Sequence, residues 1–225
     1  MENNDWAKLV ERLIKEEILR SPRVIQAMRA VPRAKFLPEN MQAYSAVDTP
    51  LPIGFGQTAS APHMVSIMNE ALQLEVGCSV LEIGAGSGWH AATIAEIIAP
   101  SGSPSSERGH IFTIEIVKEL ADFARKNIMK AGYGDRVTIT LGDGSLGYPE
   151  KAPYDRVLVT AAAPEIPKPL IEQLKPNGIM LIPVGNISLF QNLLRITKES
   201  NGKIRQENLG GVAFVPLTGR YGHNF

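Results

Sequence analysis

The chain has 225 residues, and its 23 Lys and Arg side chains balance 23 Asp and Glu side chains, so the formal net charge is zero. That length predicts a single domain with a sizeable core, and the balanced charge gives no overall field that would favour nucleic acid or an anionic membrane. Because the single cysteine, Cys78, excludes an internal disulfide, and because neither a secretory signal nor a membrane-spanning apolar run is found, we expect a soluble, cytoplasmic protein.

Two helices are expected at the start of the chain. Apolar residues recur at helical spacing over residues 5–19 with Lys and Glu between them, which is typical of an amphipathic helix. Ser21 and Pro22 then indicate the N-cap and first turn of a second helix. We expect this N-terminal helical cover to lie over a cofactor site.

The segment 46–64 is rich in proline and glycine, which deny it long regular structure. It nevertheless carries three large apolar side chains, Leu51, Ile53 and Phe55. A solvated loop would not need such anchors, so the segment is a candidate substrate platform. An alternative stays open for two of its residues: Ser60 could be the N-cap of the following helix and His63 a residue of its first turn.

A strand, a glycine turn and a helix follow one another after residue 79. The aliphatic run 80–83 predicts a buried strand, and glycines at 84, 86 and 88 precede a helical pattern. This layout lets a ligand lie against bare backbone at a helix N-terminus. A dinucleotide fingerprint would need glycine at position 89, where Trp89 stands, and a phosphate-binding loop would need Lys followed by Ser or Thr.

An acid, Glu82, stands two residues before the glycine turn. A carboxylate there suits a ligand with a cationic amino group and would repel a pyrophosphate. S-adenosylmethionine carries such an amino group. The candidate cofactor-binding residues of this stretch are therefore Glu82, Gly84, Ala85, Gly86 and Gly88.

A second acid, Glu115, ends the strand expected at 111–114. At this point of a βαβ order a carboxylate can accept hydrogen bonds from both hydroxyls of a ribose. The alternative is an acid placed at the start of the helix 117–131, where the helix dipole favours it. Its place in the βαβ order favours the ribose role.

The next two strands also end in candidate site residues. Gly142, Asp143 and Gly144 follow the strand 137–140, where the aspartate could accept from an adenine amino group and the glycines let the ring lie close. Asp-Gly is also a common turn, so this position alone is weak. Thr160 ends a continuous buried strand from residue 154 and lies beside the expected transfer point.

The acids at three strand ends predict an α/β fold, a doubly wound, mostly parallel sheet of the class I S-adenosylmethionine-dependent methyltransferase type. One domain is expected over residues 1–225, with N-terminal helices at 1–45, a substrate and cofactor loop at 46–64 and the cofactor-binding core at 65–225. The later elements are expected as a helix at 164–174 and strands at 179–184, 189–197, 203–209 and 212–217.

Several motifs outside the glycine turn are more specific than it is. They are Arg23-Val24-Ile25, Val31-Pro32-Arg33-Ala34-Lys35-Phe36-Leu37-Pro38, Pro50-Leu51-Pro52-Ile53-Gly54, Gly56-Gln57-Thr58, Ser60-Ala61-Pro62-His63-Met64, Pro153-Tyr154-Asp155-Arg156, Val159-Thr160-Ala161-Ala162-Ala163-Pro164 and Phe214-Val215-Pro216-Leu217. With these motifs the chain resembles the protein-L-isoaspartate (D-aspartate) O-methyltransferase family from about residue 20 to about residue 220.

The resemblance implies a cytosolic repair enzyme that moves the methyl group of S-adenosylmethionine to the free carboxylate of L-isoaspartyl, and possibly D-aspartyl, residues in damaged proteins and peptides. Its partners would be such proteins and peptides, with no nucleic acid and no membrane, and it would work as a monomer. No Cys/His cluster suggests a metal.

The resemblance also implies roles for single residues. Ser60 would be the active-site hydroxyl at the substrate carboxylate, Glu82 would lie at the methionine end of the cofactor, Glu115 would hold the ribose, and Asp143 with Gly144 would hold the adenine. Further cofactor contacts would come from Thr58, Ala59, Ser60, His63, Gly142 and Thr160, and substrate contacts from Pro52, Ile53, Gln57, Thr58 and Arg220. Two features depart from the family pattern: Ala59 replaces an expected isoleucine, and the loop 100–109 is longer and richer in serine.

Two other classes of function remain as alternatives. An RNA or small-molecule methyltransferase on the same fold would predict, in the RNA case, a basic patch and an Asn/Asp-Pro-Pro-Tyr motif after the fourth strand, where Thr160-Ala161-Ala162-Ala163 stands. A nucleoside-binding scaffold without catalysis would keep the glycine turn and lose the polar residues of the loop. Those residues, Gln57, Thr58, Ser60 and His63, are all present.

Overall fold

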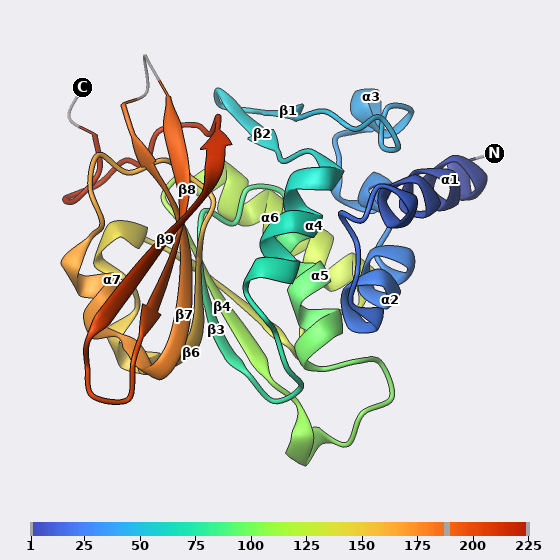
Figure 1. Cartoon of the computed structure of the whole chain (residues 1–225). Coiled ribbons are helices and arrows are strands. Elements are labelled where there is room, and N and C mark those ends of the chain that lie inside the picture. Colours follow the sequence, from blue (N-terminus) through green and yellow to red (C-terminus); the bar gives the residue numbers. More distant parts are fainter. Residues whose placement is uncertain (1, 187–189, 224–225) are drawn as a thin grey trace.

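The computed structural model describes residues 2–186 and 190–223. A seven-stranded sheet forms its centre, in the order β5-β4-β3-β6-β7-β8-β9 (Figure 1). The strands are β3 (Ser79–Ile83), β4 (His110–Glu115), β5 (Val137–Leu141), β6 (Tyr154–Val159), β7 (Leu174–Gly185), β8 (Gln191–Lys198) and β9 (Ile204–Val212). Strands β3 to β7 pair in parallel, and β8 and β9 pair antiparallel. The strand order reverses at β3, and such a switch is where open α/β sheets bind ligands.

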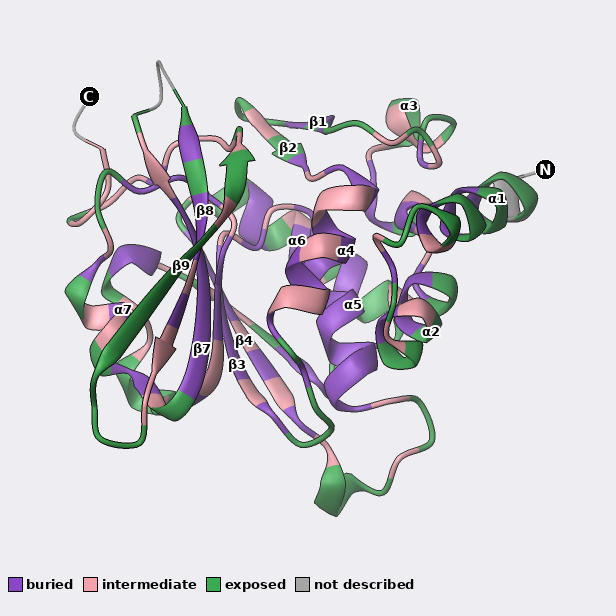
Figure 2. Cartoon of the chain, in the orientation of Figure 1, coloured by how far each residue is buried: buried purple, intermediate pink, exposed green. Residues whose placement is uncertain are grey.

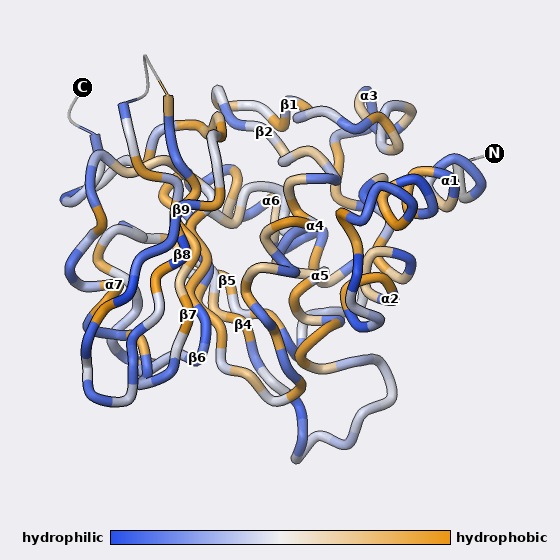
Figure 3. Tube along the Cα trace, in the orientation of Figure 1, coloured by the Kyte–Doolittle hydropathy of each residue, from blue (hydrophilic) through white to orange (hydrophobic). Residues whose placement is uncertain are grey.

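Helices cover both faces of the sheet, which confirms the predicted doubly wound, mostly parallel fold (Figure 1). One face packs against α4 (Pro62–Ala71), α5 (Trp89–Ile98) and α6 (Lys118–Ala131), and the other against the short α7 (Lys168–Glu172). Every residue of α5 is buried, because this helix lies between the sheet and further helices (Figure 2). Apolar residues concentrate along the central strands, whereas the outer strand β9 is largely hydrophilic (Figure 3).

The N-terminal helices α1 (Glu2–Lys15) and α2 (Pro22–Ala30) pack behind α5. Trp6 of α1 meets Trp89 of α5 edge to face, with ring centroids 5.8 Å apart, and its indole Nε1 donates to the Met28 carbonyl oxygen at 2.7 Å. The first helix was expected to reach residue 19 and ends at Lys15 instead, because Glu17 adopts a positive φ of 58°. Ser21 lies at the predicted N-cap of α2, although its side chain makes no capping hydrogen bond.

The segment 46–64 contains a small antiparallel hairpin, β1 (Leu51–Gly54) and β2 (Gln57–Ala59), which follows the four-residue helix α3 (Glu39–Gln42). Leu51 and Ile53 are buried as predicted. The prediction that Phe55 is a third apolar anchor is wrong: it is 59% exposed, because it stands in the hairpin turn with φ 54° between two glycines.

Arg33 fixes this hairpin to the core. Its guanidinium is fully buried and donates to the carbonyl oxygens of Thr49, at 3.0 Å, and Ala59, at 2.7 Å, and it lies 5.3 Å from the ring centroid of Trp89. Burial lowers the pKa of Arg33 to about 10, against the opposing charge of Asp48. The platform is therefore attached to α5 through a buried cation.

The C-terminal elements differ from the prediction in extent. The helix expected at 164–174 is shorter and covers only α7, Lys168–Glu172. Strand β7 begins earlier than expected, at Leu174. The expected strand 189–197 is β8 from Gln191, and position 189 lies outside the described residues. The strand expected at 203–209 is β9, which continues to Val212, and the separate strand expected at 212–217 is wrong: after Val212 the chain crosses the end of the sheet as irregular backbone with an isolated bridge from Pro216 to Ala162. Within the described residues no helix has the length and apolar character needed to cross a membrane.

Candidate functional site

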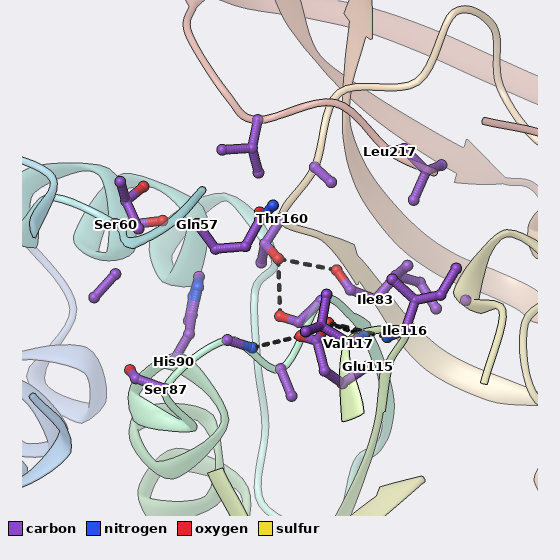
Figure 4. Close-up of a pocket in the computed structure, with 18 of the residues that line it drawn as sticks. Gln57, Ser60, Ile83, Ser87, His90, Glu115, Ile116, Val117, Thr160 and Leu217 are labelled. Atoms are coloured by element: carbon purple, nitrogen blue, oxygen red, sulfur yellow. Dashed lines mark hydrogen bonds between the residues drawn. The ribbon is translucent and has the colours of Figure 1, made fainter. Parts of the chain in front are cut away.

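A cavity opens at the carboxyl ends of β3, β4 and β6, where the strand order reverses (Figure 4). Segments far apart in sequence meet around it: the second strand of the hairpin, the glycine turn and start of α5, the end of β4, and the chain after β9. Its lining comprises Gln57, Thr58, Ala59, Ser60, Val65, Ile83, Gly84, Ala85, Gly86, Ser87, Trp89, His90, Ile114, Glu115, Ile116, Val117, Gly144, Thr160, Ala161, Val215, Pro216, Leu217 and Thr218.

The glycine turn forms the floor of this cavity. Gly84 has φ +95°, and a Cβ on it would collide with the hydroxyl of Thr160. That hydroxyl lies 2.9 Å from the carbonyl oxygens of both Ile83 and Gly84, to which it can donate. Glycine is therefore required at position 84 both by the positive φ and by the close approach of Thr160. The backbone without a side chain leaves room for a ligand above the turn.

Glu115 stands at the end of β4 with its carboxylate already oriented. One oxygen, Oε2, accepts from the backbone N–H of Gly86 at 2.9 Å, and the other, Oε1, accepts from those of Ile116 and Val117 at 2.9 and 3.0 Å. These contacts join the glycine turn to the end of the neighbouring strand. Because these hydrogen bonds fix the orientation of the carboxylate, it can present its remaining lone pairs to a diol.

Ser60 lines the opposite side of the cavity from Glu115 (Figure 4). The N-cap of α4 is Ala61, so the alternative that Ser60 is a helix cap is wrong. Among the residues that the structure describes, none forms a hydrogen bond with the Ser60 hydroxyl. A hydroxyl held at a cavity wall and free to donate is what the predicted catalytic role requires.

Glu82 does not line the cavity. It is fully buried beneath the sheet surface, and its two carboxyl oxygens have no hydrogen-bond partner among the described residues. Thr113 lies opposite it in register, but no hydrogen bond of ordinary geometry joins the two side chains. Burial, together with a smaller effect of the charge of Glu115, raises the pKa of Glu82 to about 8, so at neutral pH the group is a neutral acid.

His63 is also absent from the lining. It lies in the first turn of α4 as the alternative expected, and both its backbone N–H and its Nδ1 meet Oδ1 of Asp48 at 2.9 Å. The other oxygen of Asp48 accepts from Arg12 of α1 at 2.6 Å. Hydrogen bonds to His63, together with the positive charges of His63 and Arg12, lower the pKa of Asp48 in spite of its partial burial. This cluster ties the platform to the first helix.

Asp143 and Arg220 meet each other rather than the cavity. The Asp143 carboxylate accepts from the backbone N–H of Ser145 at 2.9 Å and from that of Arg220 at 2.8 Å. The Arg220 side chain lies over the ring of Tyr221 on the exposed C-terminal segment. Gly142 is outside the lining as well, and only Gly144 of this turn borders the cavity.

Three other predicted residues lie outside the lining of the cavity. Ile53 is buried under the hairpin, with its Cδ1 near the position that a Cβ on Gly86 would take, and Pro52 is exposed. Gly88 is the N-cap of α5, with φ 83°, and packs against Ile128 of α6.

Ten of the predicted positions do come together in the lining: Gln57, Thr58, Ala59, Ser60, Gly84, Ala85, Gly86, Glu115, Gly144 and Thr160.

The comparisons with known proteins agree with this geometry. Residues 3–222 match the family described as protein-L-isoaspartate(D-aspartate) O-methyltransferase. The chain is 56% identical, over 96% of its length and 89% of the relative, to a protein-L-isoaspartate O-methyltransferase of Hyperthermus butylicus. It is 52% identical, over 96% of its length and 95% of the relative, to one of Thermococcus sibiricus. The chain belongs to this family.

Two solved structures of protein-L-isoaspartate O-methyltransferases share the fold. One, described as putative, from Plasmodium falciparum and in complex with S-adenosyl-L-homocysteine, is 28% identical, with a TM-score of 0.82 over 94% of this chain and 97% of that one. Another is 26% identical, with a TM-score of 0.85 over 96% of this chain and 67% of that one. The resemblance and the methyltransferase fold expected from the sequence are thereby confirmed.

In this family member the sequence reasoning missed several lining residues. Val215, Pro216, Leu217 and Thr218 come from the end of the chain and reach the cavity only because the segment after β9 crosses the sheet. Phe214-Val215-Pro216-Leu217 was a recognisable motif, and no local signal placed it at the site. Ser87 and His90 stand inside and just after the glycine turn, where a polar residue facing the ligand could have been anticipated.

Proposed function

We propose that this chain transfers the methyl group of S-adenosylmethionine to the free carboxylate of L-isoaspartyl residues, and of D-aspartyl residues, in damaged proteins and peptides. One observation carries the proposal: the free hydroxyl of Ser60 and the bare backbone of Gly84–Gly86 border the same cavity. We further propose a cytoplasmic monomer that acts on proteins and peptides, without nucleic acid or membrane as partner.

The cavity fits the cofactor. Gly84 and Gly86 line the cavity with backbone that carries no side chain, and Glu115 presents a fixed carboxylate at the end of the neighbouring strand. Gly84, Ala85 and Gly86 would hold the methionine part, Glu115 the ribose, and Ile116 and Gly144 the adenine ring. When bound, S-adenosylmethionine supplies an electrophilic methyl group on a sulfonium.

Three of the cofactor roles expected from the sequence need a different interpretation. Glu82 is buried in β3 outside the lining of the cavity, so it would not touch the methionine ammonium. Its role would be structural, within the strand that precedes the glycine turn. Asp143 Oδ2 accepts one hydrogen bond, from the backbone N–H of Arg220, and keeps a lone pair that could accept from an adenine amino group, but Asp143 lies outside the lining of the cavity. His63 would support the platform through Asp48.

The residues of the cavity would perform two tasks for a carboxylate substrate, orientation of the carboxylate and exclusion of water. A carboxyl with a pKa near ~4 is already ionised at neutral pH, so no general base is needed. Ser60 would donate one hydrogen bond that orients the spectator oxygen. The alignment of carboxylate, methyl group and sulfonium by the whole cavity can contribute roughly 7–11 kcal/mol in favourable cases. Val65, Ile83 and Leu217 would exclude water, which otherwise stabilises separated charges.

The protein must bind isoaspartyl residues in many different sequences, so recognition should depend little on the side chains that flank them. Gln57 and Thr58 line the cavity from the second strand of the hairpin, and Pro52 is exposed on the first. Polar side chains beside exposed strand backbone suit an extended peptide whose main chain is recognised. Arg220, exposed on the C-terminal segment, would meet the peptide at the rim.

The proposal is tested with labelled S-adenosylmethionine and two peptides that differ at one position, aspartate against isoaspartate. Base-labile methyl ester on the isoaspartyl peptide alone is the expected result, and a D-aspartyl peptide tests the second substrate. If neither peptide is methylated while S-adenosylhomocysteine still binds, the substrate assignment is wrong, and RNA and small carboxylic acids become the next substrates to assay.

A further inference from the structure

The cavity lacks the free carboxylate that the sequence predicted for the cationic end of the cofactor. Glu82 is buried outside the lining, and Glu115 is the single acidic residue that lines the cavity in the part of the chain the structure describes. The oxygens of Glu115 already accept three backbone hydrogen bonds. Another acceptor is therefore needed near Ser60 and the turn if an ammonium group is to be held there.

His90 occupies that part of the wall. It is in the first turn of α5, 7% exposed, and lies between Ser60 and Ser87 in the close-up, across the cavity from Glu115 (Figure 4). Its Nδ1 is buried and has no hydrogen-bond partner among the described residues. A buried acceptor without a partner is unfavourable unless a ligand or a water molecule satisfies it.

The neighbours of His90 fix the position of its proton. The Thr93 hydroxyl donates to the His90 carbonyl oxygen at 2.7 Å, so Thr93 Oγ1 must accept from Asn69 Nδ2, which lies 3.2 Å away. Asn69 therefore turns its oxygen, Oδ1, toward His90 Nε2 at 3.1 Å. Since an oxygen accepts, Nε2 carries the hydrogen and Nδ1 carries the lone pair.

Burial keeps this imidazole neutral. Desolvation lowers the pKa of His90 to about 3, and the described groups that hydrogen-bond to the ring or stand beside it at the wall, Asn69, Ser60 and Ser87, are uncharged polar residues. The facing charge, Glu115, lies across the cavity. His90 therefore presents an acceptor to the cavity throughout the neutral pH range.

We propose that His90 is a cofactor-binding residue whose Nδ1 accepts a hydrogen bond from the α-ammonium group of S-adenosylmethionine. The inference rests on the proposed function. Of the donors on that molecule, the ribose hydroxyls belong at Glu115, and the ammonium is the donor on the methionine part that reaches the Ser60 side of the turn. A neutral acceptor suits it, because a protonated imidazole would repel a cation.

The test measures binding by calorimetry, without turnover, for three ligands. S-adenosylhomocysteine has the ammonium and carboxylate, 5′-(3-aminopropyl)thioadenosine has only the ammonium, and methylthioadenosine has neither.

His90→Gln can keep the contact with Asn69 and loses the acceptor at the Nδ1 position, whereas His90→Asn places an amide oxygen near that position. We expect His90→Gln to weaken the two amine-bearing ligands about 10- to 100-fold. Methylthioadenosine should bind both variants as it binds the wild type, and His90→Asn should recover most of the lost affinity.

Equal losses for all three ligands, or no loss for any, would overturn the inference. A second measurement needs no variant: in protein labelled with ¹⁵N-histidine, the His90 Nδ1 resonance should move upfield on addition of S-adenosylhomocysteine and stay in place with methylthioadenosine. An unmoved resonance in the presence of bound S-adenosylhomocysteine overturns the role of His90 alone. Wild-type protein that binds no S-adenosylhomocysteine overturns the proposed function itself.

Discussion

Glu115 Oε2 accepts a 2.9 Å hydrogen bond from the backbone N–H of Gly86, so the acid that ends β4 holds the turn that follows β3. The same carboxylate also anchors the first residues after its own strand, Ile116 and Val117. Two cofactor-facing segments are thereby positioned by one side chain, and loss of that side chain should disturb both.

Glu115→Gln should weaken S-adenosylhomocysteine binding by about 10- to 100-fold, because the amide removes the negative charge and brings an NH₂ group toward backbone N–H donors. Calorimetry measures the change. Glu107→Gln, on an exposed residue of the neighbouring loop, is the matched control and should bind as the wild type does. Unchanged affinity in Glu115→Gln would contradict the ribose and turn-positioning roles.

Ser60→Ala should lower kcat by roughly 10- to 100-fold, since one hydrogen bond to a charged oxygen is lost. The affinity for S-adenosylhomocysteine should change little, because the hydroxyl faces the substrate carboxylate in this proposal. Steady-state methylation of an isoaspartyl peptide, combined with calorimetry, separates the two quantities. Ser105→Ala, at an exposed serine, serves as control, and turnover equal to wild type in Ser60→Ala would remove the assigned role.

Arg33→Lys should lower the free energy of unfolding by about 1.5–3 kcal/mol, although the charge is kept. A lysine ends in a single nitrogen, so it cannot replace both Nη1, which donates to the Val47 and Thr49 carbonyls, and Nη2, which donates to those of Thr49 and Ala59. It also cannot place a planar group over Trp89. Urea denaturation measures the loss, and Arg23→Lys, exposed on α2, should be neutral. A stability equal to wild type would mean that the hairpin is not held by the guanidinium.

The buried acid Glu82 predicts a pH dependence with a definite sign. Its pKa is about 8 in the folded protein against an ordinary 4.5, so between these values the folded state binds a proton that the unfolded state does not. The free energy of unfolding should therefore fall as pH rises through this window, by up to about 1.4 kcal/mol per pH unit from this group.

Glu82→Gln should remove that slope. Urea denaturation at several pH values between 5 and 8 should show the stability of the variant rising relative to wild type with increasing pH. Exposed Glu75→Gln should follow the wild-type curve throughout. Parallel curves for wild type and Glu82→Gln would show that the acid is not held neutral.

The residues of the central sheet and of the glycine turn determined much of this protein by themselves. Continuous aliphatic runs specify buried parallel strands, and glycines at 84 and 86 specify a turn that only bare backbone can make, so the fold and part of the site follow from local chemistry. The family motifs at 50–64 drew attention to Ser60, which lines the cavity in the structure.

Tertiary structure alone decided which way each polar side chain faces. Glu82 is the last residue but one of β3 and Glu115 is the last residue of β4, yet only packing shows that Glu82 is buried away from the cavity while Glu115 lines it. His90 became a candidate because a chain of hydrogen bonds from Thr93 through Asn69 fixes its tautomer. Such contacts join residues distant in sequence, and their direction depends on packing that no local pattern encodes.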